Sequence, residues 1–300
     1  MGATLGLIAK LETGRTGRKT TASANSRGTQ PACFAALHGT CFCLFQTDTL
    51  APMSAAQKIR DAVARVAALR LEAASSPGLL AATTTIKRFQ ARRFAGTYAD
   101  LFDTKEYAGA ARFFLDELYS DKDYSLRDAQ FARIAGALQT FFPSAVVATA
   151  VSLAELHALT EELDHQMAIA WRRESEGTHA DDVTRYVLAW KSVGHVEDRH
   201  RQLDIVLAVG RELDRLTRTP GLRLMLRMMR RPAASSGLGS LQNFLEAGFD
   251  TFANMSGNGA RALEFLNLIK TRESHWFDHL FGPDAISCEK QLRACLSNSL

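Results

Sequence analysis

The sequence predicts an all-α protein folded as a single multi-helix bundle. Apolar residues recur at intervals of three and four in nearly every segment between residues 54 and 281, and almost no segment alternates with the two-residue period of a strand. The prolines agree with this pattern. Pro77, Pro143, Pro220 and Pro232 fall between periodic stretches or in the first turn of one, where helices tolerate proline.

The periodic stretches predict about nine or ten helices. Pro143 divides the longest uncharged stretch, residues 134–154, so we interpret that stretch as two buried helix halves and not as a membrane span. In chain order, the expected helices cover about 54–74, 83–102, 104–119, 125–142, 143–174, 180–192, 195–218, 221–230, 238–255 and 258–281.

Three of these helices carry a long apolar stripe, which is the pattern of one buried face in a packed helix. The stripes are Leu153, Leu156, Thr160, Leu163, Met167 and Ala170 in 143–174; Leu238, Leu241, Leu245, Gly248, Phe252 and Met255 in 238–255; and Ala262, Leu266, Ile269, Glu273, Trp276 and Leu280 in 258–281.

The pattern predicts one helical domain, residues 53–282, with an N-terminal extension before it and a C-terminal tail after it. Residues 10–30 are rich in Ser, Thr, Gly and Arg without an apolar period, so we expect 1–52 to be a disordered extension. That composition also suits a transit peptide. A third explanation, which we favour, is an over-long gene start, with Met53 as the first residue. Gly282-Pro283 ends the last strong helix, and 283–300 is expected to be a C-terminal tail.

The charge and cysteine distributions exclude some classes of function. The chain of 300 residues has a net charge of +4, but 1–52 alone contributes +3, so the remainder is nearly balanced. Such a balance disfavours nucleic acid as a partner. Residues 44–287 contain no cysteine, which favours a reducing compartment, and we expect a cytoplasmic protein without a transmembrane segment. Cys33, Cys41 and Cys43 lack zinc-site spacing.

The most distinctive sequence motif is FFLDELY, residues 113–119, and it is followed by a Ser125–Asp128 pattern that resembles a capping box. Glu117 lies on the shoulder of the apolar face of the first helix, and Arg127 projects from the first turn of the next. A short turn at 120–124 brings these helices together, so we expect Glu117 and Arg127 to meet. The pair is interpreted either as the rim of an anion or substrate pocket or, as we favour, as an ion pair that fixes the corner.

FFLDELY, with the following helix start at 127–133 and ELHALTEELD at 155–164, resembles the bacterial FFLEELY-motif proteins, with Asp116 in place of Glu. The resemblance covers about residues 54–281. That family has no known function, so the resemblance implies no activity, cofactor or catalytic residue.

Glu273 interrupts an apolar stripe and should therefore point inward. It is either an acid or base in a central pocket or the partner of a core arginine such as Arg93 or Arg199. His157 lies beside the stripe of 143–174, where a packing role is the ordinary one. A helical enzyme or small-ligand binder would need Glu117, Arg127, Glu273 and His157 or His200 to converge on one cavity.

Two E-x-x-H pairs, Glu162/His165 and Glu197/His200, have the spacing of a di-iron site. The helical register argues against it, because it places Glu162 and His165 on the solvent side. It places His200 near the inner stripe of Val196, Leu203 and Leu207, but turns Glu197 away from that stripe. We therefore expect no metal and no other cofactor.

The segment GLRLMLRMMRRP contains Arg223, Arg227, Arg230 and Arg231 with interleaved Leu and Met. This basic helix suits an anionic membrane, an acidic partner or RNA, although no aromatic residue is present for base stacking. The ordinary alternative, which we favour, is a solvated basic face with its methionines in the core.

These observations favour a non-catalytic helical domain that binds a protein partner or assembles with itself. Two other hypotheses stay open: a pocket-bearing enzyme or small-ligand binder, and a surface binder that acts through residues 223–231. The sequence contains no motif that decides for catalysis.

Overall fold

The structure, a computed structural model, describes residues 53–177, 180–256 and 260–299. The extension 1–52, with its expected disorder and its three cysteines, lies outside the described residues. Ser54–Leu300 form one compact unit, which is described here by itself.

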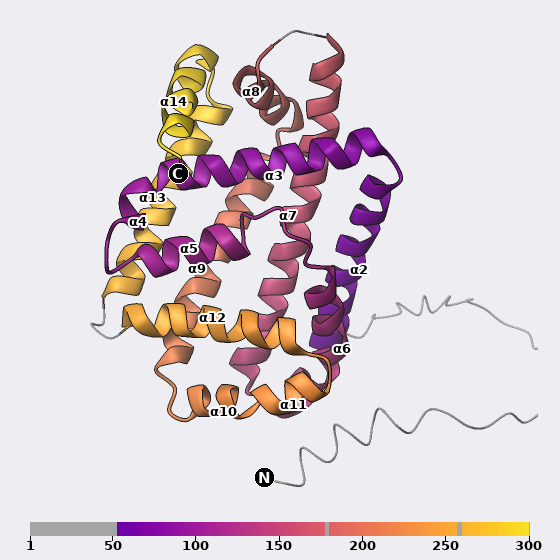
Figure 1. Cartoon of the computed structure of the whole chain (residues 1–300), viewed down its shortest axis with the longest axis vertical. Coiled ribbons are helices and arrows are strands. Elements are labelled where there is room, and N and C mark those ends of the chain that lie inside the picture. Colours follow the sequence, from indigo (N-terminus) through magenta and orange to yellow (C-terminus); the bar gives the residue numbers. More distant parts are fainter. Residues whose placement is uncertain (1–52, 178–179, 257–259, 300) are drawn as a thin grey trace, which may run out of the picture. The chain divides into compact units, whose positions relative to one another are not determined.

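All regular secondary structure in the described ranges is helical, as the sequence predicts (Figure 1). The helices are α2 (Ala55–Ala74), α3 (Pro77–Thr97), α4 (Ala99–Phe102), α5 (Ala108–Glu117), α6 (Ser125–Phe141), α7 (Ser144–Gly177), α8 (Asp182–Val193), α9 (Val196–Thr217), α10 (Leu222–Met228), α11 (Arg230–Ser235), α12 (Gly239–Ser256), α13 (Arg261–Phe281) and α14 (Ala285–Ser297).

The described part holds more helices than the nine or ten expected, partly because two expected helices divide. The range 83–102 becomes α3 and α4, since Tyr98, at φ −114° and ψ 18°, leaves the helical region. The basic segment becomes α10 and α11, which meet at Met229. Helix α3 also begins at Pro77, earlier than expected. The hydroxyl groups of Thr83 and its two successors donate to carbonyls one turn back, so these β-branched residues are accommodated in the helix.

The expected tail is also helical, which corrects the prediction for 283–300. Gly282-Pro283 does end α13, but the side chain of Asp284 then accepts a hydrogen bond from Ser287 N at 3.0 Å and caps α14. Cys288, Leu292 and Leu296 of α14 are buried in the main hydrophobic cluster. The C-terminal segment is therefore part of the fold.

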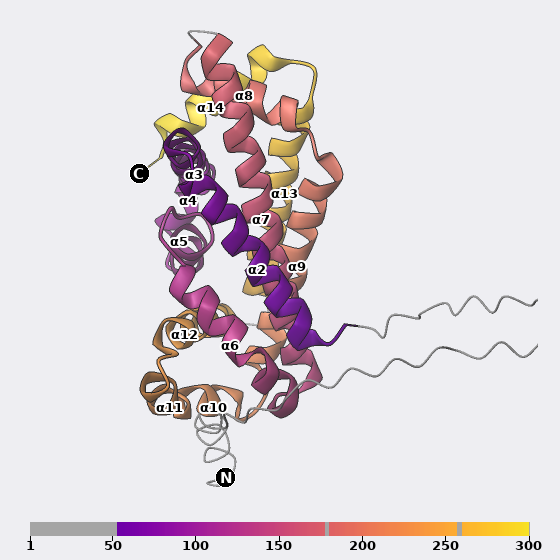
Figure 2. The same cartoon turned by 90° about the vertical axis from the view of Figure 1, so that its right-hand side faces the viewer.

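Helix α7 is the central element, and it contacts α2, α3, α6, α8 and α9. Figures 1 and 2 show α7, α9 and α13 extending along the same direction, with α3 crossing them. The break at Pro143 lies between α6 and α7, as expected. Every member of the predicted α13 stripe, including Glu273, is buried. In the described part of the chain, no helix combines the length and apolar character needed to cross a bilayer.

Candidate functional site

Glu273 of α13 lies in the interior and binds a core arginine, as the sequence indicated. Its two carboxylate oxygens accept hydrogen bonds from Arg93 Nη1 at 3.2 Å and Nη2 at 2.9 Å, and Oε1 accepts a third from Tyr98 OH at 3.1 Å. Both charged residues are buried. Burial by itself lowers the pKa of Arg93, but attraction to Glu273 raises it above its ordinary value. Arg93, not Arg199, is therefore the core arginine that pairs with Glu273.

Five buried side-chain donors have no hydrogen-bond partner among the described residues: Arg93 Nε, Arg185 Nε, Tyr186 OH, Trp190 Nε1 and Arg199 Nη2. All except Arg185 Nε belong to residues that interact with Arg93 or with one another. The Arg199 guanidinium lies 4.2 Å from the centre of the Trp190 ring, and the rings of Trp190 and Tyr186 are 5.9 Å apart. Since buried polar groups are nearly always hydrogen-bonded, a cluster of unsatisfied donors requires an explanation.

A second interior carboxyl group, Asp164 of α7, lies in the electrostatic environment of Arg199. Its oxygen accepts one hydrogen bond, from Gln90 Nε2 at 3.0 Å. Burial raises the pKa of Asp164, although the charges of Lys87 and Arg199 oppose the change. Burial likewise lowers the pKa of Arg199. Arg199 forms no ion pair with a carboxylate of the described residues, and its Nη1 donates to the neutral Gln202 Oε1 at 3.4 Å.

The last residue of FFLDELY, Tyr119, borders the same region. Its ring stacks on Phe94 at 4.5 Å. Burial and the charge of Glu273 raise the pKa of Tyr119, while Arg93 and Arg199 lower it. Burial also raises the pKa of Tyr186 to about 12. We call this group of interacting side chains the buried polar centre: Gln90, Arg93, Tyr98, Tyr119, Asp164, Tyr186, Trp190, Arg199 and Glu273.

The buried polar centre is assembled by helix packing. Arg93 and Gln90 come from one face of α3, Tyr186 and Trp190 from one face of α8 at a spacing of four, and Arg199 from the first turn of α9. Helix α7 contacts α3, α8 and α9, while α13 contacts α8 and α9. Residues far apart in sequence therefore meet in one interior region.

Glu117 and Arg127 meet, which confirms the predicted contact. Arg127 Nη1 donates to Glu117 Oε2 at 3.2 Å, and the Arg127 guanidinium lies 3.9 Å from the Tyr124 ring centre. Arg127 Nε lies 3.9 Å from Asp128 Oδ1, so the pair continues into further charged residues. The expected corner therefore exists, and it forms one end of a larger cluster.

We call this larger cluster the charge network: Lys87, Arg70, Glu161, Asp128, His157, Arg127 and Glu117. Lys87 Nζ donates to both oxygens of Glu161, at 2.7 and 2.9 Å. Arg70 Nη1 donates to Asp128 Oδ2 at 2.8 Å, and its Nη2 lies 3.4 Å from Glu161 Oε1. His157 Nε2 lies 2.9 Å from Asp128 Oδ2. Each charged member contacts an opposite charge, as expected of a structural network.

Asp128 does not form the expected capping box. Its carboxylate is buried and bonded to Arg70 and His157, while Asp123 accepts the hydrogen bond from Ser125 N at 2.8 Å. The local cap pattern was thus overridden by tertiary contacts. Burial opposes ionisation of Asp128, but His157 and Arg70 hold its pKa below its ordinary value.

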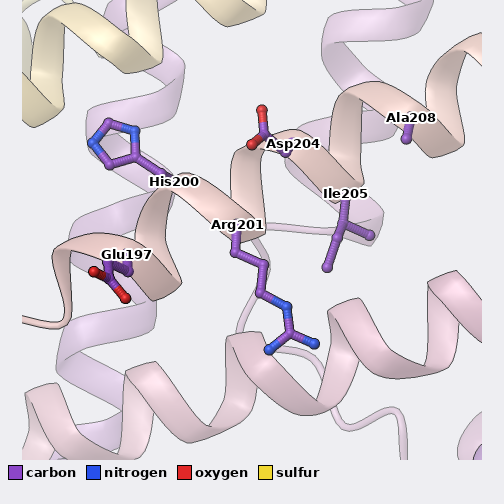
Figure 3. Close-up of a pocket in the computed structure, with 6 residues that line it drawn as sticks. All are labelled: Glu197, His200, Arg201, Asp204, Ile205 and Ala208. Carbon is purple, nitrogen blue, oxygen red and sulfur yellow. The ribbon is translucent and has the colours of Figure 1, made fainter.

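The candidate pocket residues therefore fall into three places. Glu117, Arg127 and His157 belong to the charge network, whereas Glu273 bonds with Arg93 and Tyr98 in the buried polar centre. His200 borders a surface depression of about 540 Å³ whose lining residues all come from α9. Figure 3 shows these side chains spread along the helix, with His200 and Arg201 pointing in different directions. The structure does not bring the five residues into one pocket.

The register that argued against a di-iron site was wrong for two residues, since His200, expected near the inner stripe of its helix, is exposed. His165 is buried, and its Nε2 lies 3.4 Å from Glu72 Oε1 of α2. It was expected on the solvent side, but α7 is central and packs on several faces. Among the described residues, no group of three or more His, Cys, Asp or Glu side chains has an arrangement that could hold a metal ion.

The basic segment is partly tied to the fold. Arg223 Nη2 lies 2.7 Å from Asp250 Oδ1, and Arg230 Nη2 lies 2.6 Å from Glu246 Oε2. Arg227 and Arg231 are exposed. The expectation that the methionines lie in the core was wrong for Met225 and Met228, which are 37% and 58% exposed. Helix α10 has no fully buried residue, although it contacts α9 and α12 and its Leu222 and Leu226 are half-buried.

Sequence reasoning found Glu273 but missed most of the buried polar centre. A usable signal existed for Arg199, which interrupts an apolar stripe at spacings of three from Val196 and four from Leu203. No comparable signal identified Tyr186 or Trp190, since aromatic residues on a helix face are ordinary core residues.

The fold and site define an all-helical protein with an arginine-containing polar centre in its interior. The family model described as a domain of unknown function, DUF8198, matches residues 69–286, so this chain belongs to that family. No curated protein and no solved structure matches the chain. The resemblance to bacterial FFLEELY-motif proteins stays a prediction, and it agrees with the family match in implying no known activity.

Proposed function

We propose that this protein binds a small oxyanion, such as a carboxylate or phosphate compound, in the buried polar centre. The observation that carries the proposal is the cluster of four buried donors without partners: Arg93 Nε, Tyr186 OH, Trp190 Nε1 and Arg199 Nη2. A single unsatisfied donor costs about 1–3 kcal/mol, so four together are costly unless acceptors are supplied.

The chemistry of these groups selects the ligand class. The two guanidinium groups and the indole carry donors only, and a phenol hydroxyl can donate as well. A ligand that satisfies them must therefore offer several acceptor atoms. Arg199 adds a buried positive charge, and no carboxylate of the described residues forms an ion pair with it. Arg93 is already neutralised by Glu273. A small anion with oxygen acceptors meets both requirements.

Tyr186→Phe provides a sharp test, because it removes one hydroxyl and little volume. We expect the substitution to leave the stability of the anion-free protein unchanged or raise it, since an unsatisfied group is removed. It should weaken anion binding about tenfold, the equivalent of about 1.4 kcal/mol for a hydrogen bond to a charged group. The measurement is thermal unfolding of the full chain in chloride buffer, titrated with inorganic phosphate, sulfate or malonate at constant ionic strength.

The matched control is Tyr98→Phe, whose hydroxyl donates to Glu273. This variant should lose about 1 kcal/mol of stability without anion and keep the wild-type response to anions. If Tyr186→Phe instead loses stability as Tyr98→Phe does, or if none of the three anions stabilises the wild type, the proposal is wrong and the donors serve packing or bound water.

A role in protein binding or self-assembly, and a cytoplasmic location, stay predictions from composition. Pull-down or light-scattering measurements on the full chain would address the first. Neither is needed for the ligand proposal, which depends only on interior residues.

A further inference from the structure

Helix α10 presents apolar side chains on its exposed surface. Leu224 is 63% exposed and Met228 is 58% exposed, and they lie one turn apart. In a packed helix these residue types are usually buried. Figures 1 and 2 both place α10 and α11 at one end of the helical unit. A large flat partner can therefore approach this surface from one direction.

The four arginines of this segment divide into two pairs with different contacts. Arg223 and Arg230 form ion pairs with Asp250 and Glu246 of α12, which fix the short helices to the fold. Arg227 and Arg231 are exposed, and no hydrogen bond or ion pair joins them to the described residues. The charges of Arg223 and Arg230 are thus paired within the fold. Arg227 lies near enough to Glu246 to help lower the pKa of that carboxyl group, but it forms no ion pair with it, and Arg231 is exposed.

Arg227 lies on the same face of α10 as the exposed apolar residues, because successive helix positions turn by about 100° and Leu224, Arg227 and Met228 fall within about 100° of one another. Arg231, which is also exposed, follows in the first turn of α11. We call these four residues the α10 face. It combines two positive charges with two apolar side chains, a composition that suits the boundary between lipid headgroups and acyl chains of an anionic bilayer.

We propose that the α10 face docks this protein on anionic membrane surfaces. The arginines pair with lipid phosphates, while Leu224 and Met228 enter the headgroup boundary. This occupant fits better than RNA, because residues 222–235 contain no aromatic side chain on which bases could stack. It also fits better than a protein partner, since the apolar residues are interleaved with charges instead of forming the apolar, charge-depleted centre of an interface. The inference is independent of the proposed ligand.

The test is co-sedimentation of the full chain with vesicles of phosphatidylglycerol and phosphatidylcholine at low salt. The double variant Arg227→Gln/Arg231→Gln should reduce partitioning about thirtyfold, or about fivefold per arginine near an anionic surface. Leu224→Ser/Met228→Ser should also reduce it, because apolar insertion is lost. All four side chains are exposed, so folding should be preserved, and circular dichroism checks this.

The matched control is Arg201→Gln/Arg211→Gln, which removes two exposed arginines from α9. Its net charge therefore equals that of the Arg227→Gln/Arg231→Gln variant. The control should bind vesicles as the wild type does. The basic segment 1–52 is common to all variants and cancels in the comparison. Absence of wild-type binding, equal loss in the control, or unchanged binding by the Arg227/Arg231 variant would overturn the proposal. A larger loss of affinity for oligouridine than for vesicles would assign the surface to RNA and also overturn it.

Discussion

Neighbouring interior carboxyl groups of α7 differ in their ionisation because their partners differ. Glu161 accepts two hydrogen bonds from the Lys87 ammonium, whereas Asp164, one turn further on, accepts one from the neutral amide of Gln90. Burial opposes ionisation of both, but the Lys87 charge is close enough to hold the pKa of Glu161 below its ordinary value. The pKa of Asp164 stays raised. Glu161 and Asp164 therefore contribute to the pH dependence of stability with opposite signs.

This difference predicts the acid sensitivity of the charge network. A carboxyl group whose pKa is lowered by folding stabilises the protein above its unfolded-state pKa, and this contribution is lost as pH falls through the folded-state value. Asp128 and Glu161 both have lowered pKa values. We expect Asp128→Asn to cost about 3 kcal/mol at pH 7, because Arg70 and His157 lose a charged partner, and less as pH falls below the unfolded-state pKa towards the lowered folded-state value. Urea unfolding between pH 7 and pH 3 measures this.

Asp164→Asn is the control of opposite sign. Because folding raises the pKa of Asp164, its ionisation costs stability as pH rises above the unfolded-state value. The amide should therefore stabilise the protein more at pH 7 than at pH 3. An Asp128→Asn variant whose stability deficit does not shrink in acid would show that the network contributes through packing alone.

At this scale, contacts that are close in sequence could be predicted and distant ones could not. Glu117 and Arg127 are 10 positions apart, on two helices joined by the short turn at 120–124, so the register of each helix was enough to pair them. The inward orientation of Glu273 also followed from register, but its partner is 180 positions away and both Arg93 and Arg199 were open choices. Asp128 was misassigned because a cap and a tertiary ion pair use the same residue type.

At the scale of elements, α14 depends on a close approach to α3. A Cβ atom on Gly96 would lie 2.0 Å from the Cys295 carbonyl oxygen, closer than any van der Waals contact allows. The Cys295 thiol also donates to Arg93 O at 3.3 Å. The two backbones meet beside the residue that binds Glu273, so α14 supports the buried polar centre.

Gly96→Ala should therefore separate α3 from α14 and destabilise the protein by at least about 2 kcal/mol, because backbone atoms must move. Gly109→Ala is its matched control. No atom lies within 4 Å of a Cβ at Gly109 in α5, and alanine favours helix by about 1 kcal/mol. Chemical denaturation compares the two. Equal effects of both substitutions would contradict the packing described for α14.

The sequence signal for α14 was present but weak. Cys288, Leu292 and Cys295 repeat at helical spacing, but Ile286 is 84% exposed and the segment follows a Gly-Pro stop. Gly282-Pro283 does end α13, but Asp284 caps a new helix, α14, directly afterwards. Long apolar stripes, as in α13, were predicted reliably because many positions agree in register.

Among the described residues, most of the buried apolar side chains form two hydrophobic clusters, and the charge network lies near their boundary. On α2, Arg70 follows Val66 of the smaller cluster and precedes Ala73 of the larger one. On α7, Glu161 lies between Ala158 and Met167 in the same way. The network joins α2, α3, α6 and α7 by charge where apolar packing changes from one cluster to the other. Its position favours a structural role, whereas the unsatisfied donors lie in the larger cluster.

The central claim is that these donors bind an oxyanion, and the indole N–H of Trp190 reports on it directly. The chain has three tryptophans, and Trp276 Nε1 already donates to Thr97 Oγ1 at 2.8 Å, which makes it an internal reference. In ¹⁵N–¹H correlation spectra of the full chain dialysed into chloride, titration with phosphate, sulfate or malonate should shift the Trp190 indole signal saturably while the Trp276 signal stays in place. A Trp190 signal that none of these anions moves, or that moves only together with Trp276, would contradict the account.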